Sequence, residues 1–465
     1  MVTLDSSILS VALPDLKADL GFSDVTLPWV VNAFAIPIAG LLLLCGRLSD
    51  RHGSREVLVA GVGVFTVASL AAGVAPTSEL LIVGRAAQGV GAALMSTSCL
   101  ALLSRTFDPG PERAKAFGWW AAAAGSGGAI GVLGGGIIVD LTDWRWTLLI
   151  NVPVGVALIL LVLTIGSVRP VERPRLDLVG GGAFAITAAA VVVAVASLAE
   201  TSPVWMAPEI WGPVAVAGFA VFVAVESRQA SPLIPFGVLR ATGAWRPTVT
   251  MLFLGGAMTA TFFFTTLNLQ EFHGLTPLVT GVAFLPLSLG AFGAAASAHL
   301  LQRRVGVDMT TTIGASVMSV GPGAAWLVAG GSSPGMLIAA IGVFGIGMGV
   351  ALAAISDGTT LLLPSALTGI AAAVLTTAQQ LGNSVGLAGT SVLDAAHPSI
   401  FYQTGFGSAA VLASLATAVI AGHTLARRRL PGPDKSTPIP SEDVTHLYRT
   451  GVPPMIDDHL GKRFT

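Results

Sequence analysis

The chain has 465 residues, of which 53% are hydrophobic and only 11% are charged, and its formal net charge is −1. Soluble domains contain about 25% charged residues, and 24 basic with 25 acidic side chains do not cover the surface of a soluble protein of this length. The balanced charge provides no field that would attract a polyanion. This composition excludes a soluble enzyme, a nucleic-acid-binding protein and a disordered chain, and it indicates a polytopic protein in a lipid bilayer.

The predicted elements are apolar stretches that approach the roughly 20 residues needed to cross a bilayer. Their apolar residues are continuous rather than alternating, which predicts membrane-spanning helices and not a transmembrane barrel. The predicted fold class is an all-α membrane protein with about 14 transmembrane helices. The predicted spans are residues 1–16, 26–46, 56–76, 79–104, 115–139, 146–167, 178–198, 210–226, 247–268, 277–299, 310–329, 335–356, 369–395 and 405–426.

Both ends of the chain have unusual features. The first span runs only from Met1 to Leu16, so either about ten upstream residues are missing or the start codon is assigned late, and we favour truncation. Residues 428–465 contain six prolines among mixed charges and are predicted to be a disordered cytoplasmic tail. A regulatory or partner-binding role for this tail stays open.

The basic residues predict the orientation of the helices. If the N-terminus is cytoplasmic, the inner loops and the tail hold 21 of the 24 basic residues, and the outer loops hold only Lys17 and Arg145. An excess of Lys and Arg on the cytoplasmic side is the usual bias of membrane proteins. We therefore expect both termini in the cytoplasm and a location in the plasma membrane.

Two charged residues fall inside predicted spans, where a charge costs several kcal/mol and marks a functional candidate. Asp5 lies ten residues, or about 15 Å of helix, before Asp15 at the outer end of the first span. Arg85 lies about two turns into the fourth span, and Gln88 shares its helix face. An Arg in hydrocarbon should face a cavity or a carboxylate, and Asp5 is the only deep candidate. The simpler interpretations are a helix cap for Asp5 and snorkelling to the surface for Arg85.

The loop after the second span has an ordered set of glycines and charges. It reads Gly46-Arg-Leu-Ser-Asp50-Arg51-His-Gly53-Ser-Arg55. The glycines allow a tight turn, and the charges lie at the predicted cytoplasmic surface, where charge clusters usually report only topology.

This loop resembles motif A of the major facilitator superfamily, G-x-L-x-D-R-x-G. Over nearly all spans the chain resembles the fourteen-helix drug/proton antiporter branch of that family, the QacA/EmrB type. Further matches are Leu4-Asp5…Ala12-Leu13-Pro14 in helix 1, Arg85…Gln88-Gly89 of motif B, Trp144-Arg145-Trp146…Asn151-Val-Pro153 before helix 6, and Leu269-Gln270…Gly274…Pro277 between helices 9 and 10.

Motif C, the antiporter signature G-x-x-x-G-P-x-x-G-G, is the place where the sequence departs from the pattern. Its glycines fall on Gly127, Gly131, Gly135 and Gly136, while Val132 replaces the proline. Glycines four residues apart form a flat stripe for close helix packing. The missing proline predicts a weaker kink and leaves strict antiport open.

The resemblance implies two pseudo-symmetric six-helix halves, residues 1–167 and 247–427, with two inserted helices in 168–246 and the tail in 428–465. It implies a monomeric bacterial exporter driven by the proton-motive force through alternating access. Asp5 and Arg85 would couple transport to protons, and Gly46, Asp50, Arg51, Gly53 and Arg55 would form a cytoplasmic latch. Alternatives are a proton symporter for a small organic nutrient and, less favoured, a polytopic membrane enzyme or a sensor.

The predicted substrate is a small amphiphilic, neutral or weakly cationic drug-like molecule, because the spans contain amides and aromatic rings but no second deep carboxylate. The candidate cavity residues are Trp29, Asn32, Gln88, Trp119, Asn268, Gln270, Gln380 and Asn383. No ATP-binding motif occurs, and the seven histidines lie outside the spans or near their ends. We therefore expect no cofactor, no metal site and no catalytic residues.

Overall fold

The computed structural model describes residues 1–107, 111–166, 177–198, 207–229, 234, 236–331, 333–362, 368–396 and 401–429. The predicted tail, apart from its first two residues, lies outside the described residues. Within the described part the chain is helical and has no strand. Its elements are α1 (Val2–Leu20), α2 (Trp29–His52), α3 (Ser54–Gly73), α4 (Ser78–Thr106), α5 (Pro111–Leu141), α6 (Trp146–Leu149), α7 (Asn151–Leu163), α8 (Leu178–Ala196), α9 (Pro208–Glu226), α10 (Phe236–Thr242), α11 (Trp245–Leu267), the π-helix η2 (Asn268–Phe272), α12 (Pro277–Ala283), α13 (Leu285–Val305), α14 (Val307–Val328), α15 (Pro334–Leu362), α16 (Thr368–Ala396) and α17 (Phe401–Arg429).

The structure confirms the all-α membrane class. Each predicted span overlaps one or two of these helices, and ten helical segments of the described residues are long and apolar enough to cross a bilayer. Two predicted spans are divided into two helices, α6 with α7 and α12 with α13. Both divisions lie just before a proline, Pro153 and Pro286, which has no N–H to continue the hydrogen bonds of a helix.

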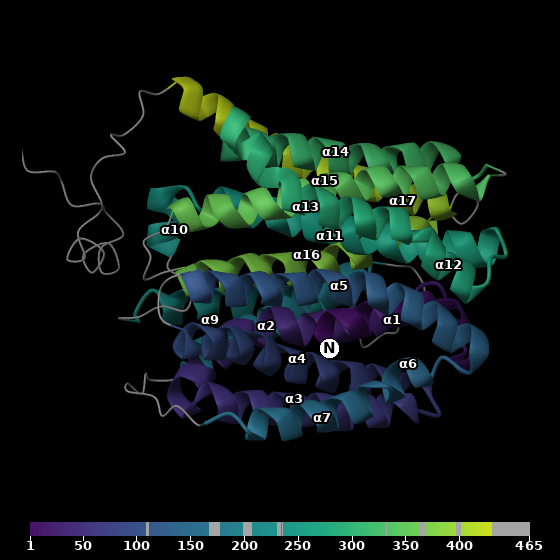
Figure 1. The fold of residues 1–465 in the computed structure, drawn as a ribbon, viewed down its shortest axis with the longest axis horizontal. Helices are drawn as coiled ribbons and strands as arrows, with labels where there is room; N and C mark the ends of the chain where they lie inside the picture. Colours follow the sequence, from purple (N-terminus) through teal and green to yellow (C-terminus); the bar gives the residue numbers. More distant parts are fainter. Residues whose placement is uncertain are drawn as a thin grey trace, which may run out of the picture.

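The helices lie roughly along the longest axis of the molecule and form two groups (Figure 1). The first group contains α1–α7, where α2 and α3 both pack on α4, and α5 packs on α1. The second group contains α11–α17, where α15 packs between α13 and α14, and α11 packs on α16 and α17. Helix α8 contacts both groups through α2 and α16, and α9 packs on α8.

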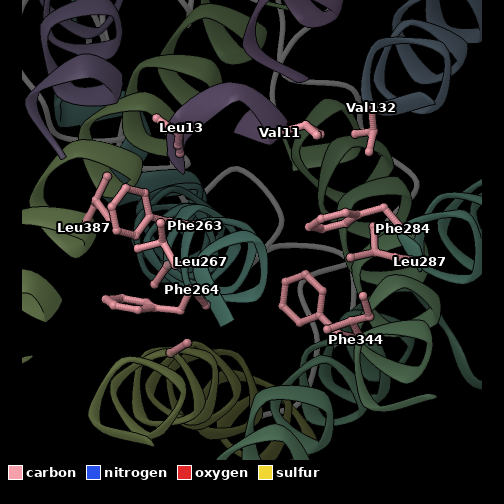
Figure 2. Close-up of a cluster of buried hydrophobic side chains, with 14 of the residues drawn as sticks. Val11, Leu13, Val132, Phe263, Phe264, Leu267, Phe284, Leu287, Phe344 and Leu387 are labelled. Carbon is pink, nitrogen blue, oxygen red and sulfur yellow. The ribbon is translucent and has the colours of Figure 1, made fainter. Parts of the chain in front are cut away.

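The two groups meet along α16 with α2, α12 with α5, and α1 with α11. A large cluster of buried apolar side chains joins them. Figure 2 shows Val11 and Leu13 of α1 and Val132 of α5 on one side, facing aromatic residues of the second group such as Phe264, Phe284 and Phe344. The N-terminus lies about halfway along the bundle in Figure 1, so α1 runs from the middle toward the end that carries α6 and α12.

Candidate functional site

The predicted pair of intramembrane charges is in direct contact. Nη1 of Arg85 donates to Oδ2 of Asp5 at 2.6 Å, and the two side chains are 2% and 0% exposed. They come from α4 and α1, separated by 80 residues in sequence. Placing two charges away from solvent is costly unless their remaining donors and acceptors are satisfied. The other contacts of this ion pair therefore decide whether it is stable.

The Arg85 guanidinium is held on several sides. Its Nε donates to the carbonyl of Val30 at 3.0 Å, and Nη1 also donates to Oε1 of Gln88 at 2.8 Å. The ring of Phe34 lies 4.2 Å from the guanidinium carbon, in the geometry of a cation–π contact. Val30 and Phe34, both on α2, thus hold the Arg85 side chain of α4 in place.

The second oxygen of Asp5 accepts two amide donors. Nδ2 of Asn151 lies 2.7 Å from Oδ1, and Nε2 of Gln88 lies 3.2 Å from the same atom. The Gln88 amide also donates to the hydroxyl of Ser69 at 2.7 Å. The network thus joins α1, α2, α3, α4 and α7 around one carboxylate. Asp5 itself bonds to side chains of α4 and α7, while α2 is reached through Arg85 and α3 through Gln88.

Sequence reasoning placed Asp5, Arg85 and Gln88 together but left out three members of this network. The sequence presents Asn151 only as part of a motif and gives no reason to single out Phe34 or Ser69. A polar residue at the start of α7 and a serine within the apolar α3 are weak sequence signals of a place in a buried polar network. Their helix faces relative to Asp5 become known only from the packing.

The residues of the α2–α3 turn, the predicted latch, contact other helices of the first group. Asp50 accepts from Nη2 of Arg105 at 2.9 Å, which links the end of α2 to the end of α4. Arg55 donates to the carbonyls of Val162 and Leu163 at the end of α7. The side chain of Arg51 is exposed.

The two glycines of this turn differ in their surroundings. Gly53 has a backbone φ of +104°, which L side chains rarely adopt, so the turn requires a glycine there. A Cβ at Gly46 would lie 4.0 Å from Thr97, which is an ordinary contact. The geometry therefore explains Gly53 and leaves Gly46 unexplained.

The glycines of the motif C segment allow α5 to approach two helices closely. A Cβ at Gly131 would lie 2.7 Å from Cβ of Ser7, and one at Gly135 would lie 2.7 Å from the carbonyl oxygen of Ile8, both on α1. A Cβ at Gly127 would meet Thr3 at 3.6 Å. Gly136 faces the second group instead, 2.7 Å from the carbonyl oxygen of Pro277.

Polar contacts join the two groups at the end that carries α6 and α12. Nε2 of Gln270 donates to the carbonyl of Val11 at 2.8 Å, and Nζ of Lys17 lies 2.8 Å from Glu271 and 2.6 Å from Asp24. Tyr402 donates to the other oxygen of Glu271 at 3.3 Å. Partial burial lowers the pKa of Lys17, but the hydrogen bonds to Asp24 and Glu271 outweigh it and raise the pKa overall. The amine therefore stays charged at this interface.

The eight candidate cavity residues are not gathered at one place. Gln88 belongs to the Asp5 network and Gln270 to the contact between groups, while Trp119 is 70% exposed. Asn268 is fully buried and donates to the carbonyl of Ala329.

The remaining four lie in other places again. Trp29 is half-buried at the start of α2, and the amides of Gln380 and Asn383 lie 2.8 Å apart on α16. Asn32 is 1% exposed, and its Oδ1 has no hydrogen-bond partner among the described residues. No cluster of three or more His, Cys, Asp or Glu suited to a metal occurs in the described part of the chain.

The sequence comparisons agree with the fold. The model of the Major Facilitator Superfamily matches residues 1–387. The chain is 32% identical to the cephamycin export protein CmcT of Amycolatopsis lactamdurans over 94% of this chain and 93% of that protein. It is 35% identical to the puromycin resistance protein pur8 of Streptomyces alboniger, over 83% and 78%. It is 32% identical to the tetracenomycin C resistance and export protein of Streptomyces glaucescens, over 84% and 73%.

Solved structures show the same fold at low sequence identity. An auto-inhibited peptide transporter of the POT family superposes with a TM-score of 0.65 at 17% identity, over 94% of this chain and 97% of that one. A bacterial homologue of the lysosomal transporter Spinster, in an inward-facing and unoccupied conformation, gives 0.63 at 16% identity, over 93% and 96%. With its helical fold, its apolar spans and its match to the family model, the chain is a multi-pass membrane protein that belongs to the major facilitator superfamily.

Proposed function

We propose that this protein is a bacterial plasma-membrane exporter that exchanges protons for small amphiphilic, drug-like molecules by alternating access. The observation that carries the proposal is the Asp5–Arg85 ion pair, which is buried where a charge is expensive and lies at the centre of a hydrogen-bond network that joins five helices. The relatives named for the export of cephamycin and tetracenomycin C, and for resistance to puromycin, support an antibiotic-like substrate.

Protonation of Asp5 is the proposed coupling step. A carboxylate accepts charge-assisted hydrogen bonds from Arg85 and Asn151, and these bonds weaken when the carboxyl is neutral. The helices that the network joins would then be free to shift relative to α1. Because Asp5 is fully buried here, the proton would reach it after the α6/α12 end of the bundle has opened.

Alternating access would be a movement of the first group against the second, which correspond to the two six-helix halves. In the structure the groups contact each other at the α6/α12 end, the predicted outer side. The α2–α3 turn would stabilise the opposite, cytoplasmic side. We also propose that the chain crosses the membrane 14 times, that both termini lie in the cytoplasm and that the protein functions as a monomer.

Substitution of Asp5 tests the proposal. In everted vesicles with an imposed proton gradient, Asp5→Asn should abolish uphill transport of an antibiotic such as puromycin. Substrate counterflow without a gradient should persist, because it needs no change in protonation. Asp15→Asn, on the exposed side of the same helix, is the matched control and should retain activity. Full gradient-driven transport by Asp5→Asn would refute the assigned role.

A further inference from the structure

A cavity with the dimensions of a ligand site lies within the second group. Helices α11, α14, α16 and α17 border an open cavity of about 790 Å³. Small-molecule sites usually occupy about 300–1,000 Å³. Neither the Asp5 network nor any of the eight candidate cavity residues lines it.

The sequence explains why the cavity is present. Gly382, Gly386 and Gly389 recur along α16, and Gly407 lies opposite on α17. A Cβ at Gly386 would lie 2.3 Å from Cα of Gly256, so α11 and α16 cross in close contact and form the floor. The absence of side chains at Gly389 and Gly407 leaves the space above this crossing empty.

The lining of the cavity indicates the chemistry of its occupant. No lining residue is ionisable, and the hydroxyls of Thr390 and Ser408 bond to carbonyls of their own helices. The side chains that border the opening, Trp326 and Val411, are 49% and 59% exposed and in a membrane protein would meet lipid. One amide, that of Gln403 in the first turn of α17, lies at the predicted outer end. A neutral molecule with an apolar body and one polar end fits this lining.

We propose that this cavity, reached from the outer leaflet, binds the apolar body of a neutral amphiphilic substrate, with its polar end near Gln403. This inference rests on the proposed function and adds a peripheral binding site to it. The same crossing of α11 and α16 brings the backbone carbonyl of Gln379 and the side-chain amide of Asn383 close to Gly255. A ligand above the crossing therefore touches the helices that bound the interface with the first group.

The test is equilibrium photolabelling of the purified protein in nanodiscs. The probe is a neutral naphthylamine dye that carries a diazirine, and the labelled peptides are mapped by mass spectrometry. The expected labels lie on 403–412 of α17 and on 323–326 of α14. Val411→Trp should reduce labelling about tenfold, since filling the cavity removes about 1.4 kcal/mol or more of apolar contact.

Leu415→Trp is the matched control, because Leu415 is exposed one turn further along α17 but does not line the cavity. It should label like the wild type. Equal labelling of both variants, or labelling by a diazirine phosphatidylcholine and not by the neutral dye, would overturn the proposal, the latter result indicating a lipid site. The measurement needs no proton gradient, so its outcome is independent of the Asp5→Asn transport result.

Discussion

The two helix groups bury polar atoms in different ways. The first group surrounds the Asp5–Arg85 ion pair with two amides and an aromatic ring, and a hydroxyl bonds to one of those amides. Among the described residues of α11–α17, no charged side chain is buried, and the buried polar residues there are threonines, one serine and Asn268. The first group thus contains the buried charge pair, and the second contains a pocket without ionisable lining residues.

This difference separates two requirements of a coupled transporter. A buried charge pair has two distinct states that differ in charge, so it can act as a switch. Apolar walls and glycine crossings discriminate poorly between molecules, so they accept ligands of varied shape. If the division holds, substitutions in the first group should change coupling and stability, whereas those in the second should change which molecules bind.

The largest effect is expected from leaving one charge of the pair alone. Arg85→Gln removes the partner of a fully buried carboxylate, and such a change costs about 3–5 kcal/mol. The double variant Asp5→Asn/Arg85→Gln buries two neutral amides and should recover most of that loss. Thermal unfolding of the three purified proteins measures the difference. A double variant less stable than Arg85→Gln would show that the network needs its charges for folding and does not act as a switch.

Close glycine packing, in contrast, should matter equally in both groups. Gly131→Ala in α5 and Gly386→Ala in α16 each place a Cβ within 2.7 Å or less of a neighbouring helix. Overpacking of this kind costs about 1–3 kcal/mol. Gly134→Ala and Gly293→Ala are matched controls, because nothing lies within 4 Å of the added carbon, and they should be neutral or stabilising through better helix propensity. Unequal costs at Gly131 and Gly386, measured by thermal unfolding, would extend the difference between the groups to their packing.

Much of the fold could be predicted from the sequence, because hydropathy alone determines which segments enter the bilayer. The charged residues Asp15, Lys17 and Asp19 ended the first predicted span at residue 16, yet α1 continues to Leu20. A helix can extend beyond the hydrocarbon, so polarity marks the membrane boundary and not the helix end. The division of two spans into two helices each is explained by the N–H that proline lacks and is not predicted by hydropathy.

The candidate site was predictable only where the cost of burial left few alternatives. Arg85 needed a deep carboxylate, and Asp5 was the one available, so the pair followed from elimination. A buried amide or aromatic ring does not need a charged partner. Trp119 and Asn268 were equally good candidates for a cavity, but one is 70% exposed and the other is fully buried. Helical periodicity identifies a face, but it does not tell whether that face meets lipid, another helix or a cavity.

The smallest effect is expected where the two groups touch through partly exposed charges. The side chains of Lys17 and Glu271 are 23% and 26% exposed, and pairs of this kind contribute about 0.2–1 kcal/mol. Because the pair joins the groups, its loss should favour opening of the α6/α12 end. In a background without native cysteines, Lys17→Met should increase the reaction of Leu13→Cys with a membrane-impermeant maleimide by no more than about fivefold, the equivalent of about 1 kcal/mol.

The matched control for this last prediction is the ion pair of Asp19 with Arg145, 2.7 Å apart at the same end of the bundle but within the first group. Asp19→Asn removes a partly exposed charge pair, 46% and 30% exposed, without touching the second group, so the reactivity of the cysteine at position 13 should not change. Glu271→Gln should act like Lys17→Met, and the double variant should add little, since both changes break the Lys17–Glu271 contact and the Lys17–Asp24 pair that Lys17→Met also removes lies within the first group. If Asp19→Asn increased the reaction as much as Lys17→Met, opening would depend on local loosening of α1 rather than on separation of the two groups. The difference between a first group with a buried charge pair and a second group without one would then describe composition alone, because the two would not move as separate bodies.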